Sequence, residues 1–396
     1  MSRENSTATP ARIRARESVN KIARWYRSVA IVSLSTVILF VAVNGVLSLG
    51  FAIRDRFFGR SGPSLIYPES DLAAVYPQYD AEERKALLAE TWSRPFTYES
   101  YVLVKEAAVH GKYVNVSEIG FRSVKNQGPW PPSPTNFNVF VFGGSTTFGY
   151  GVADTETFAS YLQEDLARRA RRRVCLYNFG TGTYYSTQER ILFERLLIQG
   201  HKPEIAIFVD GLNELWHTTD EPVFSEKVST AFDQSSTALL LQKLPMARLL
   251  RKIQKEMGSR NIVSEAELQA VLRRYQQNKK LIEGACREFG LTPVFVWQPV
   301  PSYQYETRYH MFWPSPETYQ NQAKGYAEME RICKAGTLGD NFLWCANLQQ
   351  EEKECVYVDV HHYTAKFTKK LAEAACQMCV ERRLVTPTAL EAEPAR

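Results

Sequence analysis

The stretch NVFVFGGSTTFG, residues 138–149, decides the fold of the larger part of this chain. An apolar run over residues 138–142 has the composition of a buried strand, and Gly143 and Gly144 follow it. Two glycines permit a sharp turn and the close approach of other backbone. The turn therefore presents Ser145 at the exit of a strand. A phosphate-binding loop is excluded because its Lys-Ser/Thr ending is missing, and Thr147 stands where a Gly-x-Ser-x-Gly elbow has its second glycine.

Strand-like and helix-like patterns alternate outward from this turn as far as residue 383. This alternation predicts an α/β fold with a parallel sheet sandwiched by helices. Functional residues of such sheets lie at the carboxyl ends of the strands. Residues 217–262 interrupt the alternation and are expected to form an inserted cap. The expected strands are 138–142, 174–179, 204–209, 292–297 and 356–360, and the expected helices are 155–173, 186–199, 264–289, 317–333 and 364–383.

Three further groups of polar residues and glycines come at the ends of expected strands. They are Asn178-Phe-Gly-Thr-Gly-Thr183, Asp210-Gly-Leu-Asn-Glu214 and Asp359-Val-His-His362. Glycine-turn amides and an Asn side chain are suitable donors to a developing oxyanion. Histidine can take the proton of a serine hydroxyl, and a carboxylate can orient the imidazole ring. Each group alone is also compatible with an ordinary turn or helix cap, but their order along one sheet favours a common site.

The order Ser, Gly, Gly-x-Asn, Asp-x-x-His resembles the SGNH (GDSL-like) hydrolase superfamily, in particular its membrane-anchored branches. The resemblance covers roughly residues 137–383. The Gly143-Gly144-Ser145 turn, the Gly211-Leu212-Asn213 turn and Asp359 to His362 carry it most specifically. It implies a flavodoxin-like three-layer fold.

The resemblance also implies the roles of three residues. Ser145 would be the nucleophile, His362 the general base and Asp359 the group that orients the base. His361 is the rival base, and the Asp-x-x-His spacing favours His362.

The same resemblance implies an oxyanion hole lined by the Ser145 amide, the Asn213 side chain and an amide of residues 178–188. The family's oxyanion glycine aligns best with Thr183, with Gly182 one position earlier, so both are candidates. Gly144 stands where the family commonly has Asp.

An uncharged run from Ser28 to Ile53 is long enough to cross a bilayer as a helix. Seven basic residues precede it, and Trp25 and Tyr26 lie at its border. The positive-inside rule then predicts a cytoplasmic N-terminus and an extracytoplasmic main body. The expected division is a tail (1–27), a membrane anchor (28–53), an irregular N-terminal extension (54–135), a hydrolase-like domain (136–385) and a C-terminal tail (386–396).

Charge and cysteine usage restrict the partners. Residues 1–53 hold seven basic and two acidic side chains, so the net charge of +5 lies in this arm and the rest of the chain is neutral. A neutral body argues against nucleic-acid binding. We expect no cofactor and no metal, and we interpret Cys376-x-x-Cys379 as structural. Outside the cytoplasm, the pairs Cys345–Cys355 and Cys376–Cys379 could oxidise, and the odd total of 7 leaves at least one thiol.

These observations predict an extracytoplasmic serine esterase that acts on acyl esters, most simply O-acetyl esters, of cell-surface carbohydrate. Lipid esters are a second substrate class, because the anchor would hold the site near a membrane. An O-acetyltransferase with the same triad, and a non-catalytic carbohydrate-binding or assembly protein with this fold, are the alternatives. The aromatic residues at 303, 305, 309, 312 and 313 are candidates either for stacking on sugar rings or for packing a lid. The oligomeric state is left open.

Overall fold

The structure is a computed structural model that describes residues 10–57, 67–225, 228–229, 244–247, 249, 263–313 and 319–385. Two compact units are present. One comprises residues 1–60 and 233–259, and the other residues 61–232 and 260–396. The expected insert 217–262 lies largely, and the expected C-terminal tail 386–396 wholly, outside the described residues, whereas residues 10–27 of the expected N-terminal tail are part of a described helix. The proposed domain boundaries stay predictions.

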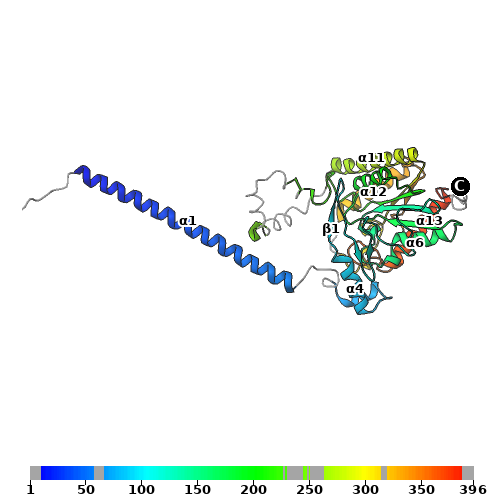
Figure 1. Ribbon diagram of the computed structural model, residues 1–396, viewed down its shortest axis with the longest axis horizontal. Coiled ribbons are helices and arrows are strands. Elements are labelled where there is room, and N and C mark those ends of the chain that lie inside the picture. The colour runs from blue at the N-terminus through cyan, green and yellow to red at the C-terminus, as the bar shows by residue number, and fades with distance from the viewer. Residues whose placement is uncertain are drawn as a thin grey trace, which may run out of the picture. The chain divides into compact units, whose positions relative to one another are not determined.

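The first unit contains one long helix, α1 (Pro10–Phe57; Figure 1). Its segment Val19–Ala52 is long and apolar enough to cross a membrane, and a signal sequence near the N-terminus would meet the same description. The polar side chains of Thr36 and Asn44 donate hydrogen bonds to carbonyl oxygens one turn earlier, at 2.8 and 2.9 Å. These bonds satisfy their donors inside the helix, as a lipid environment requires.

The second unit is built on a five-stranded sheet with the order β6-β5-β7-β8-β9. All four pairings are parallel. This order is the flavodoxin-like arrangement, in which ligands bind beyond the carboxyl ends of the strands. The strands are β5 (Phe137–Gly143), β6 (Val174–Asn178), β7 (Ile205–Asp210), β8 (Thr292–Trp297) and β9 (Phe342–Trp344).

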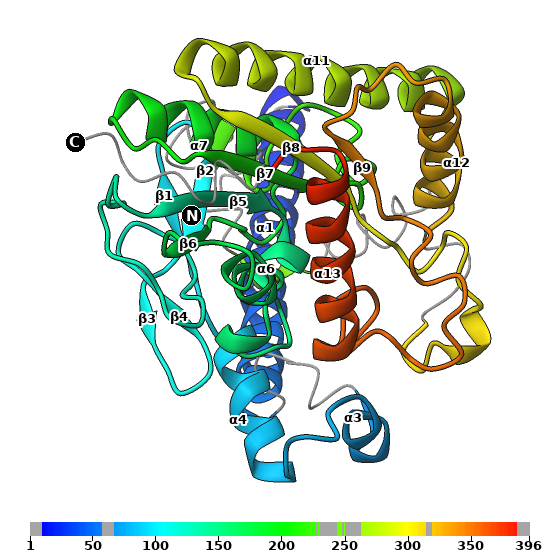
Figure 2. The ribbon, with the colours of Figure 1, turned by 90° about the vertical axis from the view of Figure 1, so that its right-hand side faces the viewer.

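The alternation of side chains along the strands divides the core into two layers of different composition. One face of the sheet presents mainly aromatic residues, among them Phe140, Phe142, Phe208, Phe295 and Trp297, to α7 (Ser186–Ile198), α11 (Glu265–Phe289) and α12 (Gln320–Lys334). The opposite face presents aliphatic residues to α6 (Phe158–Ala167) and α13 (Ala365–Glu381). Figure 2 shows α7 and α11 on one side of the sheet and α6 and α13 on the other. The predicted α/β three-layer fold is confirmed.

The expected strand at 356–360 is wrong. The last strand of the sheet is β9, and residues 356–360 form an irregular segment with a single bridge between Tyr357 and Tyr363. Val356, Tyr357 and Val358 are buried because they pack against the cores on either side, and this burial mimics a strand pattern. The helix expected at 155–173 is shorter, because Thr157 caps it and it ends before Arg168.

The extension 67–135 belongs to the second unit and is folded against the part of it that carries the five-stranded sheet, which we call the sheet unit. It contains α3 (Glu69–Val75), α4 (Ala81–Trp92), the hairpin of β1 (Phe96–Glu99) and β2 (Leu103–Glu106), and the short strands β3 (Val109–His110) and β4 (Asn115–Val116). Its apolar residues share a core cluster with Phe148 and Val358 of the sheet unit. The extension thus packs both against the residues that follow Ser145 and against the residues that precede Asp359.

Arg122 anchors this extension to the loop that follows Ser145. Its guanidinium is fully buried and pairs with Asp154 at 2.9 Å. It also donates to the carbonyl oxygens of Phe148, Gly149 and Val152 at 2.9, 2.5 and 2.6 Å. One side chain therefore satisfies three carbonyl groups of a single turn.

We predict that Arg122→Met lowers the free energy of unfolding by about 3–5 kcal/mol, because it removes the buried cation that pairs with Asp154 and donates to three carbonyl groups. Lys366→Met is the control, since it breaks an exposed pair with Glu354 and should change stability little. Chemical denaturation followed by tryptophan fluorescence measures both. Equal stability of the two variants would contradict the anchoring role of Arg122.

Candidate active site

Ser145 is placed by a turn that needs glycine on both of its preceding positions. Gly143 has φ +156°, and a Cβ there would lie 2.1 Å from Thr147 Oγ1. Gly144 has an ordinary φ of −82°, but a Cβ there would lie 2.3 Å from Asn213 Nδ2. Close approach, rather than backbone conformation, therefore requires glycine at 144. Ser145 begins the short helix α5 (Ser145–Phe148) directly after β5.

Ser145, His362 and Asp359 form one continuous chain of hydrogen bonds. Ser145 Oγ lies 2.8 Å from His362 Nε2, and His362 Nδ1 lies 2.7 Å from Asp359 Oδ2. The three residues are 8%, 3% and 4% exposed, so the chain is shielded from water but its serine is partly accessible. An ionised Asp359 accepts a hydrogen bond from Nδ1–H, which leaves the lone pair of Nε2 free to accept a hydrogen bond from the Ser145 hydroxyl.

Asp359 is held as a carboxylate by its surroundings. Its other oxygen, Oδ1, accepts the backbone N–H groups of His361 and His362 at 2.9 and 2.8 Å. Burial by itself would raise the pKa of Asp359, but the adjacent His362 and these hydrogen bonds outweigh it and hold the pKa well below its usual range. The carboxylate therefore stays ionised at neutral pH.

His361 faces a different partner. Its Nδ1 lies 3.1 Å from Tyr319 Oη, whereas the contact to Ser145 is made by His362. Burial, followed by the adjacent charge of His362, lowers the pKa of His361 to about 3. His361 is thus neutral when His362 carries a proton, and His362 is the histidine that contacts Ser145.

Two aromatic residues fix the plane of the His362 ring. Tyr150 stacks on it with ring centroids 5.3 Å apart, and Trp92 of α4 meets it edge-on at 5.5 Å. Neither residue belongs to a recognisable motif, so sequence reasoning missed both. Trp92 comes from the extension, which therefore contributes directly to the surroundings of the imidazole.

The Asn213 side chain lies beside the Ser145 turn. Its Nδ2 donates to Tyr184 O at 2.7 Å and lies close to Gly144. Thr183 has φ +72°, a left-handed conformation that is unusual for a β-branched residue and typical of functional turns. Its carbonyl oxygen lies 3.1 Å from His217 Nε2. Two neighbouring carbonyl oxygens of this turn, those of Thr183 and Tyr184, are therefore bound by the side chains of His217 and Asn213.

The Gly182 amide has another partner. Its N–H donates to Glu106 Oε1 at 3.0 Å, so this group does not point to an oxyanion beside Ser145. The Gly182 amide is therefore engaged with Glu106, and the roles of Gly182 and Thr183 as second-loop donors stay predictions. Gly182 is needed for space, because a Cβ there would lie 2.6 Å from Tyr150 Oη.

Buried carboxyl groups lie next to the turn that carries Asn213. Glu214 Oε1 accepts the N–H of Ser186, and burial raises the pKa of Glu214, Asp210 and Glu189. Among the described residues, no group of three or more His, Cys, Asp or Glu is arranged to hold a metal ion. All seven cysteines are free in this structure, including the pairs Cys345–Cys355 and Cys376–Cys379 that could oxidise.

The aromatic segment after β8 mostly packs the core. Tyr303, Tyr305 and Phe312 are at least nine-tenths buried, which removes them as exposed stacking platforms. Trp313 stacks on Tyr319 with centroids 5.2 Å apart, and Trp216 meets the same tyrosine at 5.8 Å. Trp216 is 48% exposed.

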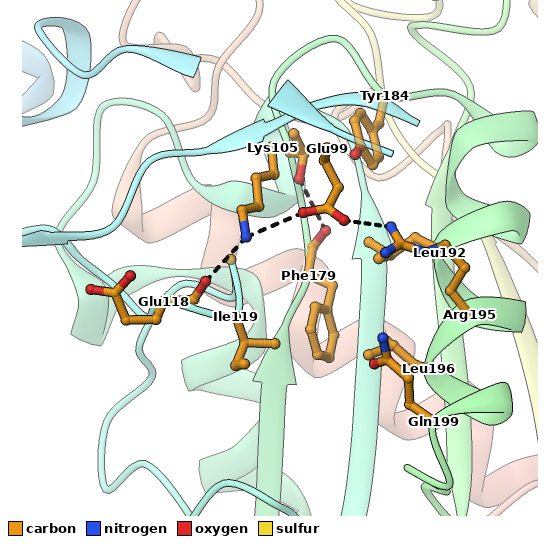
Figure 3. Close-up of a pocket in the computed structure, with 12 residues that line it drawn as sticks. Glu99, Lys105, Glu118, Ile119, Phe179, Tyr184, Leu192, Arg195, Leu196 and Gln199 are labelled. Atoms are coloured by element: carbon orange, nitrogen blue, oxygen red, sulfur yellow. Dashed lines mark hydrogen bonds and ion pairs between the residues drawn. The ribbon is translucent and has the colours of Figure 1, made fainter. Parts of the chain in front are cut away.

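A cavity of about 160 Å³ lies behind the loop that carries Thr183 (Figure 3). Thr181 and Tyr184 line it, but Ser145, Asp359 and His362 do not. Glu99 occupies its rim and bridges Lys105 and Arg195 at 3.2 and 2.6 Å. The cavity is therefore separate from the hydrogen-bonded chain of Ser145.

No family model matches this sequence, and no curated protein matches it. Three similar solved structures are a protein assigned to the G-D-S-L lipolytic family from Desulfitobacterium hafniense DCB-2 (13% identity, 61% of this chain and 99% of that chain, TM-score 0.36), the acetyl xylan esterase AlAXEase (10%, 61% and 100%, 0.34) and the lipase Lip_vut3 from a goat rumen metagenome (12%, 61% and 97%, 0.38).

The depressed pKa of Asp359 predicts an acid-dependent loss of stability. A carboxyl group whose pKa is lower in the folded state stabilises the fold above its unfolded pKa, and this contribution is lost as the pH falls below about 4. We expect the wild-type chain to exceed Asp359→Asn in free energy of unfolding at pH 7, and the difference to shrink between pH 5 and 3. Urea denaturation across this range measures it. A difference that does not change with pH would contradict the ionised, stabilised Asp359.

Proposed function

We propose that the chain is an SGNH-type serine ester hydrolase in which Ser145 is the nucleophile, His362 the general base and Asp359 its orienting carboxylate. The observation that carries the proposal is the continuous hydrogen-bonded chain from Asp359 through His362 to Ser145 Oγ. A serine hydroxyl becomes an effective nucleophile when an adjacent base takes its proton. Ser145 lies just beyond the carboxyl end of β5, where such folds bind ligands.

Each step of the reaction follows from these contacts. Ser145 Oγ bonds to the ester carbonyl carbon while its proton passes to His362 Nε2. The carbonyl oxygen becomes an oxyanion, for which we propose Asn213 Nδ2 and the amides of Ser145 and Thr183 as donors. The bond to the alcohol then breaks, and the alcohol leaves with the proton from His362. Water, deprotonated by His362, attacks the acyl-Ser145 ester and releases the acid and the free serine.

A carbohydrate ester is the substrate class that the surroundings favour. Trp216 is about half exposed and lies beside Tyr319, and Tyr319 in turn contacts His361. Exposed aromatic faces next to a polar site suit a sugar ring, with its apolar faces and polar edges. The acyl group we propose is acetyl. A sugar hydroxyl in place of water would turn the same acyl-enzyme into an acetyltransferase.

The proposed location is outside the cytoplasm, with the chain anchored by residues 28–53. The basic excess before this segment supports it, since positively charged flanks remain on the cytoplasmic side. The cell-surface position would bring the site to an extracellular polymer or to the membrane.

A serine-directed fluorophosphonate tests the proposal most simply. The full chain, purified in detergent, should form an adduct at Ser145 and release acetate from p-nitrophenyl acetate, and Ser145→Ala should do neither. Mass spectrometry of the peptide that contains residue 145 reads the first result, and a chromogenic assay reads the second. An acetylated polysaccharide tests hydrolysis, which releases free acetate from it. An unacetylated polysaccharide added with p-nitrophenyl acetate tests transfer, which moves acetyl groups to the sugar and lowers the release of free acetate. Equal rates for wild type and Ser145→Ala would refute the hydrolase, and sugar binding without turnover would indicate the non-catalytic alternative.

We also predict that Gly144→Ala lowers kcat roughly 10- to 100-fold with little change in fold, because its Cβ displaces the Asn213 amide. The φ of residue 144 is acceptable for alanine, so the backbone need not change. Gly284→Ala is the matched control, since nothing lies within 4 Å of the added Cβ. Steady-state kinetics and circular dichroism compare the two. An unchanged kcat in Gly144→Ala would exclude Asn213 from the oxyanion hole.

A further inference from the structure

The hairpin of β1 and β2 is bound to the loop that carries Thr183. Two hydrogen bonds join them, Gly182 N–H to Glu106 Oε1 at 3.0 Å and Tyr184 Oη to Val104 O, and a third joins the first turn of α7 to the hairpin, Gln188 Nε2 to Val102 O at 2.7 Å. Val102, Val104 and Tyr184 also form a small apolar core of their own. The hairpin and the loop therefore make one packed element, although they lie far apart in the sequence.

Glu106 is the only carboxylate among these three contacts, and it is almost fully buried. Its Oε1 accepts from Tyr150 Oη at 2.8 Å as well as from Gly182 N–H. Its Oε2 accepts from Arg94 Nη1 at 2.8 Å, with the two side chains 5% and 1% exposed. Hydrogen bonds to an ionised acceptor are stronger and more directional than neutral ones. Glu106 thus holds two groups from the sheet unit with one oxygen.

Both of those groups border the candidate site. Gly182 immediately precedes Thr183, whose left-handed φ of +72° depends on the position of the preceding peptide. Tyr150 stacks on the ring of His362. A shift of Glu106 would therefore move the oxyanion side and the imidazole side of the site together.

We propose that Glu106 is a positioning residue for the reaction, which acts through Gly182 on the Thr183 amide and through Tyr150 on His362. The inference rests on the proposed function of Ser145. The proposal gives the extension a function in the site, because the hydrolase-like domain 136–385 without the extension would lack the contacts of Glu106. Glu106 itself does not contact the reacting atoms, and its effect is on the geometry that stabilises the transition state.

A pair of double variants separates this role from that of a structural ion pair. Removal of one partner of a buried pair leaves an unpaired charge, whereas removal of both is often neutral for stability. Arg94→Met combined with Glu106→Ala therefore removes the pair and the acceptor. Arg94→Met combined with Glu106→Gln removes the pair but keeps an oxygen for Gly182 and Tyr150.

In detergent-solubilised full chain, we expect the alanine double variant to lose kcat roughly 10- to 100-fold for p-nitrophenyl acetate, with KM nearly unchanged, since misplaced donors weaken the transition state and not the ground state. Hydrogen exchange of the peptide covering residues 178–185 should become faster in the same variant. The glutamine double variant should restore both kcat and slow exchange.

Glu90→Ala is the control within the extension, because Glu90 accepts the N–H groups of Tyr113 and Val114 at 2.7 and 3.0 Å, away from the loop. It should lower thermal stability and leave kcat unchanged. Equal kcat and equal exchange in the two double variants, or an equal loss of kcat in Glu90→Ala, would overturn the proposal. Absence of turnover and of Ser145 labelling in the wild-type chain would refute the proposed function instead, and the exchange comparison would still decide whether Glu106 fixes the loop.

Discussion

The hydrogen bond between Ser145 Oγ and His362 Nε2 joins residues 217 positions apart in the chain. It exists because β5 ends in a tight glycine turn and because the segment after β9 returns across the carboxyl end of the sheet. The rest of the site depends on that meeting point. Asp359 orients the imidazole, and the neutral state of His361 allows a half-buried histidine to lie beside the buried His362 without a second charge.

The extension before the sheet is part of the same architecture. Arg122 binds the turn after Ser145, Trp92 lies against His362, and Glu106 binds the loop of Thr183. These residues contact three different parts of the site. Trp92 comes from α4, Glu106 from β2 and Arg122 from the segment that follows β4. A site of this kind needs support around the groups that perform the chemistry, because small displacements cost much of the rate. The extension gives that support in this chain.

Much of the fold and of the candidate site could be predicted from the sequence. The strands β5, β7 and β8 are long, wholly apolar or nearly so, and each ends in glycine or polar residues, so Ser145 and Asn213 could be placed at one sheet edge. Asp359 and His362 were identified by their spacing, although the strand assigned before them was wrong. The true last strand, Phe342–Trp344, is too short for its pattern to stand out.

The contacts that could not be predicted are those between distant segments with no motif. Nothing in the sequence pairs Glu106 with Gly182, which are 76 positions apart, so the Gly182 amide stayed a candidate donor beside that of Thr183. The burial of Tyr303, Tyr305 and Phe312 likewise depends on what packs above them. The local sequence pattern indicates the type of an element and which of its faces is apolar, whereas the Glu106–Gly182 contact and the burial of the tyrosines depend on tertiary packing.

The most direct measurement of the central claim is an experimental structure of the full chain after reaction with a fluorophosphonate, which leaves a tetrahedral phosphorus in place of the reacting carbon. The account predicts phosphorus bonded to Ser145 Oγ, one phosphoryl oxygen within hydrogen-bond distance of Asn213 Nδ2 and the Thr183 amide, and an intact contact between His362 and Asp359. A phosphoryl oxygen turned away from Asn213 and Thr183, or a His362 ring that no longer lies beside residue 145, would contradict it.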